Sequence, residues 1–187
     1  MKVFLILILS FTFIISARAQ DYPDSGFTNK AEAKNLMVNG LKEGKWVEYI
    51  DDTLQVTANE SKASFYRLSI YKSGKIYGII NQYYKNGKIE CTTPYTDGKR
   101  NGLEKVYYKT GELEWEIPFT KDKENGISKK YYTNGRLEFE FPYTNSKLNG
   151  FEKIYYKNGN LQSETEWLYS HKTDNTKNYD KNSNEIK

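Results

Sequence analysis

Apolar and polar residues alternate with a period of two along the middle of the chain. In segment 113–119, apolar residues occupy the odd-numbered positions and polar residues or proline the even-numbered ones, and segment 137–143 repeats this order. Such alternation is typical of a β-strand with one apolar and one polar face. Asn-Gly pairs such as Asn134-Gly135 stand between these runs, and Asn-Gly favours a type I′ hairpin turn because both central residues need a positive φ. The pattern therefore predicts consecutive β-hairpins.

The hairpins repeat every 24 residues, because four glycines at this spacing (Gly78, Gly102, Gly126 and Gly150) carry similar neighbours with them. Each is followed by a tyrosine pair, a second glycine, an Ile or Leu, and finally an aromatic residue at fixed distances. The tyrosine pairs are Tyr83-Tyr84, Tyr107-Tyr108, Tyr131-Tyr132 and Tyr155-Tyr156. A degenerate unit starts at Gly44 and contains an insertion near residues 54–63. We predict an all-β protein, an elongated single-layer antiparallel sheet of consecutive β-hairpin repeats with about five units.

A two-residue turn at Asn134-Gly135 would also fix which residues face each other. It would pair Tyr132 with Leu137, Tyr131 with Glu138, Lys130 with Phe139, and Lys129 with Glu140. The same rule pairs Lys105 with Glu116, and Lys153 with Glu164. One face of the sheet would then be charged and the other apolar. Cross-strand pairs contribute about 0.2–1 kcal/mol each, enough to disfavour a one-residue slip.

Both ends of the chain differ from the repeats. Residues 1–19 combine an early lysine, an apolar run and an Ala-Arg-Ala site, as in a cleaved signal peptide too short to span a bilayer. We expect export to the periplasm, the cell surface or the medium, and a protein that is not transmembrane. The expected divisions are a signal peptide (1–19), a lead-in (20–43) with one short helical turn around residues 31–36, the repeat domain (44–169, with units from 44, 78, 102, 126 and 150) and a disordered polar tail (170–187).

Charge and residue types exclude several classes of function. Removing residues 1–19 takes away Lys2 and Arg18 and no acid, so the net charge falls from +4 to +2 with acids and bases interleaved. This excludes a typical nucleic-acid binder. His171 is the only histidine and Cys91 the only cysteine, so we expect no His-containing triad, no conventional metal site and no intramolecular disulfide.

Catalysis and cofactor binding are not expected either. Equivalent glutamates of successive hairpins should lie roughly 10 Å apart, beyond the separation of glycosidase carboxylate pairs. No glycine-rich phosphate loop precedes a helix. We therefore predict a protein that is not an enzyme and has no catalytic, metal or cofactor-binding residues.

The repeat resembles the MORN-repeat variant family, and specifically proteins described as YwqK-like antitoxins. The matching residues are Asn125-Gly126, Tyr131-Tyr132, Asn134-Gly135, Leu137 and Tyr143, and the resemblance extends over about residues 39–169. It implies an elongated sheet of hairpins that contacts proteins or membrane surfaces, and the antitoxin name implies neutralisation of a partner protein. The expected signal peptide departs from that last role, which belongs to the cytoplasm.

Two surfaces are candidate binding sites. The first tyrosine of each pair should lie on the charged face, where exposed tyrosine is suited to an interface: Tyr83, Tyr107, Tyr131 and Tyr155. A row of cations should lie at the hairpin-turn edge: Lys85, Lys88, Lys109, Arg136 and Lys157. We expect a binding or scaffold module for a protein partner. A module that binds polysaccharide or acidic lipid through these surfaces and an antitoxin-like neutraliser are the alternatives. The second tyrosines are expected to stabilise the apolar face by stacking.

Overall fold

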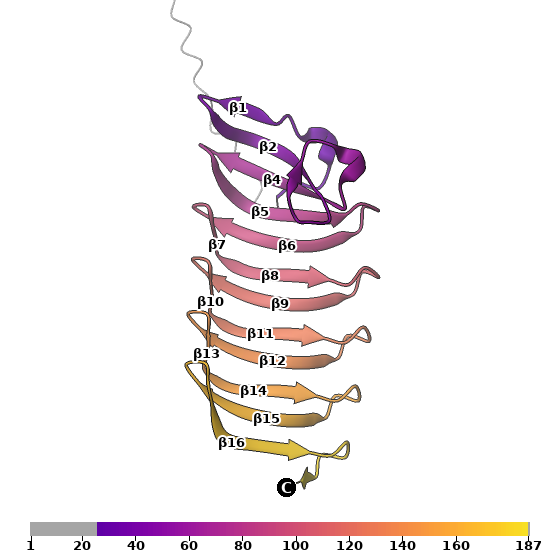
Figure 1. The fold of residues 1–187 in the computed structure, drawn as a ribbon, viewed down its shortest axis with the longest axis vertical. Coiled ribbons are helices and arrows are strands. Elements are labelled where there is room, and N and C mark those ends of the chain that lie inside the picture. Colours follow the sequence, from indigo (N-terminus) through magenta and orange to yellow (C-terminus); the bar gives the residue numbers. More distant parts are fainter. Residues whose placement is uncertain (1–25, 187) are drawn as a thin grey trace, which may run out of the picture.

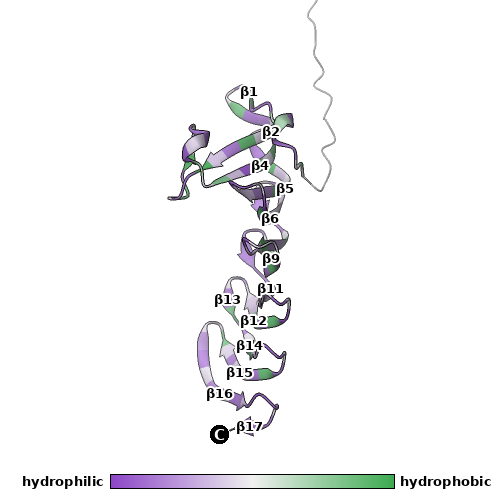
Figure 2. Ribbon diagram, turned by 90° about the vertical axis from the view of Figure 1, so that its right-hand side faces the viewer, coloured by the Kyte–Doolittle hydropathy of each residue, from purple (hydrophilic) through white to green (hydrophobic). Residues whose placement is uncertain are grey.

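The protein is one open antiparallel sheet of consecutive hairpins (Figure 1). The computed structural model describes residues 26–186, so the expected signal peptide lies outside the described residues. Seen edge-on, the sheet is a single layer along the repeats (Figure 2). The predicted all-β, single-layer fold is confirmed.

The main strands pair in the order β1, β2, β4, β5, β6, β8, β9, β11, β12, β14, β15, β16 and β17. The longer strands are β2 (Leu41–Ile50), β4 (Phe65–Lys72), β5 (Lys75–Tyr84), β6 (Ile89–Thr96), β8 (Gly102–Tyr107), β9 (Leu113–Thr120), β11 (Gly126–Tyr131), β12 (Leu137–Thr144), β14 (Gly150–Tyr155), β15 (Leu161–Leu168) and β16 (His171–Tyr179). The short elements are η1 (Lys30–Glu32), β1 (Leu36–Val38), β3 (Val56–Thr57), η2 (Glu60–Lys62), β7 (Lys99–Arg100), β10 (Lys123–Glu124), β13 (Lys147–Leu148) and β17 (Glu185–Ile186). The predicted insertion contains β3 and η2.

The turn at Asn134-Gly135 is not the predicted two-residue turn. The Tyr132 amide donates to the Arg136 carbonyl at 2.8 Å, and the Gly135 amide donates to the Tyr132 carbonyl at 2.8 Å. This leaves a three-residue loop in which Gly135 takes the left-handed conformation, with φ +78°. Such loops end in a bulge that glycine accommodates, and they need no positive φ at the preceding residue.

The predicted register nevertheless holds in the body of the strands. Lys129 lies opposite Glu140 and Lys130 opposite Phe139, and the other two units have the expected Lys–Glu pairs. Tyr131, however, lies opposite Leu137 rather than Glu138, because a bulge follows Lys130. The bulge inserts one extra residue in β12, and this compensates for the extra residue of the loop.

The type I′ geometry occurs instead in the turns that connect successive units. Asp97 and Gly98 have φ of +51° and +76°, and Asn145 and Ser146 have +50° and +64°. The second residue of each turn hydrogen-bonds to the preceding unit, as when the Ser146 amide donates to the Glu124 carbonyl at 2.8 Å. These turns therefore stack along one edge of the sheet.

The glycine that opens a repeat is required by both conformation and space. Gly126 has φ +124°, and a Cβ there would lie 2.9 Å from Cγ of Pro118. Gly102 and Gly150 have the same relation to the proline eight residues earlier. A side chain would be strained and would collide with the ring, which accounts for glycine at these three repeat positions.

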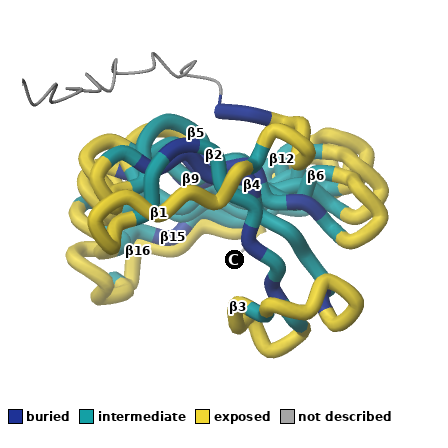
Figure 3. Tube along the Cα trace, turned by 90° about the horizontal axis from the view of Figure 1, so that it is seen from above, coloured by how far each residue is buried: buried dark blue, intermediate teal, exposed yellow. Residues whose placement is uncertain are grey.

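The lead-in covers the N-terminal end of the sheet. Gly26 and Phe27 lie against β4 and β5, where Figure 3 shows them as a buried segment. Phe27 packs with Leu68, Ile70 and Tyr83 in the main apolar cluster, and the Asn81 Nδ2 donates to the Phe27 carbonyl at 3.0 Å. The helical turn expected around residues 31–36 is shorter and begins earlier, as the 3₁₀ helix η1, and Leu36 already belongs to β1.

The prediction of a disordered tail over residues 170–187 was wrong, because residues 171–179 form β16 and pair with β15. Backbone pairing needs no apolar residues, so a polar sequence can close the sheet. Tyr179 also continues the repeat, since it lies 24 residues after Tyr155. Its hydroxyl donates to Glu164 at 3.4 Å, and Lys177 lies 3.6 Å from the same carboxylate.

Candidate binding surfaces

The sheet has two faces with different chemistry. The tyrosine face is the side that carries Lys129 and Glu140, together with the first tyrosine of each pair. The aromatic face is the side that carries Trp115, Phe139 and Phe141. The Phe141 ring stacks on those of Trp115 and Phe139, with centroids 6.2 and 5.5 Å away. Alternation along each strand separates the two sets.

The candidate tyrosines occupy one row but differ in their surroundings. Tyr83 is only 8% exposed and stacks on Tyr66 beneath the lead-in, so the expectation that it is available for binding was wrong. Tyr107, Tyr131 and Tyr155 are half-buried. The lead-in covers Tyr83 because the unit from Gly44 has the apolar residues Leu68 and Ile70 where the units from Gly102 and Gly126 have glutamate and proline.

Two of these tyrosines connect neighbouring units. The Tyr131 hydroxyl donates to Oε2 of Glu116, and the Tyr155 hydroxyl donates to Oε2 of Glu140, both at 2.8 Å. Burial and the hydrogen bond to Glu116 raise the pKa of Tyr131 to about 12. Burial and the bond to Glu140 raise the pKa of Tyr155 as well. The position equivalent to Glu116, 24 residues earlier, is Thr92, so the repeat offers Tyr107 a threonine in place of a glutamate.

The second tyrosine of each pair also connects units, by hydrogen bonds to the backbone. Its hydroxyl donates to the carbonyl of the first tyrosine position in the next unit. The four bonds run from Tyr84 to Tyr107 (3.3 Å), Tyr108 to Tyr131 (2.6 Å), Tyr132 to Tyr155 (2.7 Å) and Tyr156 to Tyr179 (2.9 Å). The row therefore stabilises the stack through hydrogen bonds as well as through its apolar rings.

The predicted basic edge exists, but its side chains are engaged with neighbouring loops. Lys85 donates to the Ser61 carbonyl, Lys88 to the Thr110 carbonyl and Arg136 to the Lys157 carbonyl, at 2.9, 3.1 and 3.2 Å. Lys109 and Lys157 lie 5.9 and 5.8 Å from the ring centroids of Tyr84 and Tyr132. These contacts favour a structural role over a free basic surface.

Sequence reasoning missed an apolar stripe on the tyrosine face. Leu103, Ile127 and Phe151 are 42%, 51% and 43% exposed and directly follow the repeat glycines. Leu103 lies opposite Pro118, and Ile127 lies opposite Pro142. The signal was present as an apolar residue recurring every 24 positions, although periodicity alone does not show whether such a residue is covered.

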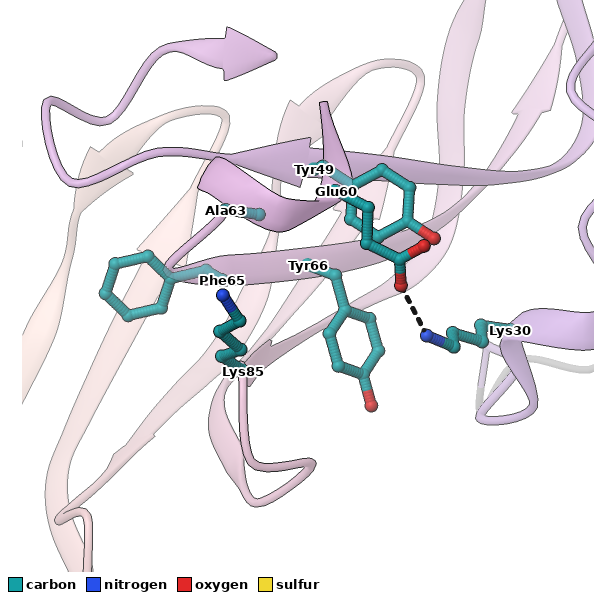
Figure 4. Close-up of a pocket in the computed structure, with 7 residues that line it drawn as sticks. All are labelled: Lys30, Tyr49, Glu60, Ala63, Phe65, Tyr66 and Lys85. Carbon is teal, nitrogen blue, oxygen red and sulfur yellow. Dashed lines mark hydrogen bonds and ion pairs between the residues drawn. The ribbon is translucent and has the colours of Figure 1, made fainter. Parts of the chain in front are cut away.

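A small pocket of about 170 Å³ lies where the lead-in meets the insertion (Figure 4). Its base includes Tyr49 and Tyr66, and the Lys30 ammonium lies 2.8 Å from the Glu60 carboxylate across it. The remaining lining residues are Ala63, Phe65 and Lys85. The ion pair joins η1 to η2, so this pocket marks a contact between two peripheral segments.

A buried acid is neutralised at the N-terminal end of the aromatic face. Glu48 is 7% exposed and accepts hydrogen bonds from Lys42, from Arg67 at 3.0 and 3.2 Å, and from Tyr71 at 3.4 Å. Burial opposes ionisation of this carboxyl, but Lys42 and Arg67 outweigh it and hold its pKa below the usual value. The network stabilises the pairing of β2 with β4.

The described residues contain no group of three or more His, Cys, Asp or Glu side chains placed to hold a metal ion. Within residues 26–186, no helix has the length and apolar character needed to cross a membrane. Burial and the nearby Glu90 raise the pKa of the Cys91 thiol, which keeps it in the unreactive protonated form.

Four segments of the chain match the family model for the MORN repeat variant: residues 77–97, 100–121, 124–145 and 148–168. Each combines a first strand, its hairpin loop and a complete second strand, and only β5 begins two residues before its segment. MORN repeats are a non-catalytic repeat type and generally serve as modules that bind proteins or membranes. No curated protein matches the chain significantly. The resemblance to this repeat type is thus confirmed over four consecutive segments of the chain, between residues 77 and 168.

Proposed function

We propose that this chain is an exported, non-enzymatic scaffold that binds a protein partner through its tyrosine face. The observation that carries the proposal is the exposed stripe of Leu103, Ile127 and Phe151. Contiguous apolar rows on a soluble surface usually mark an interface, because covering them removes apolar area from water at about 25 cal/mol per Å².

The surroundings of the stripe also suit a protein interface. Lys105, Lys129 and Lys153 flank it beside the row of glutamates on the same face, which gives a polar rim around an apolar centre. Both charges are present in similar number, so the face has no strong preference for an acidic polymer. The engaged cations of the basic edge likewise give less support to a lipid or polysaccharide surface.

The lead-in provides an intramolecular example of how this face is covered. In the unit from Gly78, Ile79 occupies the stripe position and lies opposite Pro94, and Gly26 lies against its backbone. Phe27 is buried beside it. Later units present the same row without a covering segment among residues 26–186.

Export is part of the proposal and rests on the signal-peptide pattern of residues 1–19. We place the mature protein in the cell envelope or the secreted space. Neutralisation of a partner, as in the antitoxins that the repeat resembles, is one form that such binding takes.

Affinity capture from envelope and secreted fractions of the native host tests the proposal. A variant with Leu103→Ser, Ile127→Ser and Phe151→Ser should lose the companion protein captured by the wild type, while its melting temperature changes little. Leu54→Ser with Val56→Ser is a matched control, since both residues are exposed in the insertion. Equal capture by the stripe variant and the wild type would contradict binding through this face.

A further inference from the structure

The unit that begins at Gly126 has a serine on the aromatic face where both neighbouring units have a glutamate. Glu104 and Glu152 occupy this position in the units from Gly102 and Gly150, and Ser128 stands between them. Glu104 accepts a hydrogen bond from Thr93 at 2.7 Å, and Glu152 accepts one from Trp167 Nε1 at 2.6 Å. The shorter serine leaves space where its neighbours place a carboxylate.

That space is a hollow of about 350 Å³ with mainly apolar walls. It is lined by Trp115, Ile117, Glu124, Ser128, Phe141 and Tyr143. Ser128 is 2% exposed and its hydroxyl has no hydrogen-bond partner. A buried hydroxyl without a partner destabilises the free protein, so a ligand group that bonds to it gains affinity.

The hollow also has a carboxylate without an ion pair. Glu124 lies on the same face because it pairs with Phe119, and its carboxylate forms no ion pair within residues 26–186. Arg100 is nearby, but its guanidinium lies over the Phe119 ring at 3.9 Å and its Nε lies 3.9 Å from Asp122. Burial raises the pKa of Glu124 more than Arg100 lowers it.

The charges that act on Tyr143, those of Glu124 and Glu152, are both negative. Burial raises the pKa of this phenol, and the charges of Glu124 and Glu152 raise it further. Lys130, on the same face, lies 3.1 Å from Glu138, with its ammonium 5.7 Å from the Trp115 ring centroid. The nearby cations are thus paired with other acids, and the hollow retains a negative field.

We propose that this Ser128 hollow binds a cationic group on an apolar stem, such as a lysine or arginine side chain. Aromatic rings attract cations through their quadrupoles, and an anionic carboxylate adds to the attraction. The Ser128 hydroxyl accepts a hydrogen bond from the cation, and Ile117 contacts the stem. The site is on the opposite face from the stripe, so it stands independently of the proposed function.

An NMR titration of the mature protein with n-butylammonium tests the site, with 1-butanol as a neutral analogue of equal size. We expect shifts of the Trp115 indole and Ser128 amide signals with a dissociation constant on the order of millimolar, and roughly tenfold weaker binding of 1-butanol. Glu124→Gln should weaken butylammonium binding and leave that of 1-butanol unchanged. Ser128→Leu should abolish both and raise the melting temperature, because it fills the hollow and removes the unpartnered hydroxyl.

Four results would overturn the proposal. One is equal binding of 1-butanol and butylammonium, which would make the hollow a merely apolar site. Another is stronger binding of methyl β-glucopyranoside, which would assign it to neutral carbohydrate. The third is a folded Glu124→Gln variant that binds butylammonium as the wild type does. The fourth is a wild type whose Trp115 and Ser128 signals do not respond.

Discussion

Glu48 is a polar residue whose loss should cost substantial stability, because it is a buried carboxylate with two cationic partners. We expect Glu48→Gln to lower the free energy of unfolding by about 2–3 kcal/mol at pH 7, as it leaves Lys42 and Arg67 without their anion. Urea denaturation followed by circular dichroism measures this. Glu32→Gln, which removes an exposed partner of Lys45, should change stability by less than about 0.5 kcal/mol.

The same network sets a pH dependence. The pKa of Glu48 in the folded protein is below its unfolded value near 4.5, so its stabilisation is complete above that value and is lost as the pH falls through the folded pKa. The difference between wild type and Glu48→Gln should therefore shrink steadily below about pH 4.5. Denaturation curves at pH 7, 5 and 3 check this, and a constant difference would refute the assigned network.

The tyrosine–glutamate bonds give a second prediction with an internal control. Tyr131→Phe should cost about 1–2 kcal/mol because it removes a hydrogen bond to the Glu116 carboxylate. Tyr107→Phe should cost much less, since Thr92 replaces the glutamate acceptor there. Thermal melts of the two variants decide the matter, and equal destabilisation would show that the hydroxyl bond contributes nothing specific.

The pKa of Tyr131 gives this prediction a pH dependence. Its folded value is raised to about 12, so its contribution to stability is complete below the unfolded pKa and is lost as the pH rises from about 10 through 12. The stability difference between wild type and Tyr131→Phe should therefore decrease over that interval. A difference that grows with pH would contradict a phenol that donates to Glu116.

At the scale of the hairpin, the residue type in a connecting turn should affect stability, because these turns contain residues in the left-handed conformation. Lys121 adopts φ +50° at a position where Asn145 stands in the next unit. Asparagine tolerates the left-handed region better than lysine does. We expect Lys121→Asn to stabilise the protein and Asn145→Lys to destabilise it, each by roughly 0.5–1 kcal/mol. Differential scanning calorimetry measures both, and shifts of the same sign would contradict the turn assignment.

The hairpins could be predicted because alternation and the 24-residue spacing are properties of the residues themselves. The type of turn at Asn134-Gly135 could not, because two compensating irregularities produce the same strand register as one tight turn. The tail was mispredicted since its strand depends on backbone pairing to β15, which an apolar pattern does not reveal. The sequence feature that indicated a further strand was Tyr179, which lies 24 residues after Tyr155.

The candidate binding surfaces were predicted only in part, because burial and side-chain partners depend on contacts that the sequence pattern does not reveal. Sequence placed Tyr107, Tyr131 and Tyr155 in one row, but the fold covers Tyr83 and directs two of the hydroxyls to glutamates. Ser128 is visible in the sequence as a departure from Glu104 and Glu152. That its hydroxyl is buried without a partner depends on the packing of Phe141 and Trp115 around it.

At the scale of the whole molecule, each unit is stabilised mainly by its neighbours, so the ends of the sheet need protection. Strands β16 and β17 cover β15 with a polar sequence. Removal of residues 171–187 should lower the melting temperature by several degrees and promote self-association, because it exposes the edge of β15. Calorimetry and sedimentation velocity test this, and an unchanged, monomeric protein would show that the tail does not protect the sheet.

The central claim is that the partner contacts the apolar stripe of the tyrosine face. A photo-crosslinking amino acid at Ile127 tests it most directly, with the same group at exposed Leu54 as the comparison. The account predicts a covalent adduct with a defined partner protein from Ile127 and none from Leu54, and loss of the adduct when Leu103 and Phe151 are changed to serine. An adduct from Leu54 alone, or one from Ile127 that survives those two changes, would contradict it.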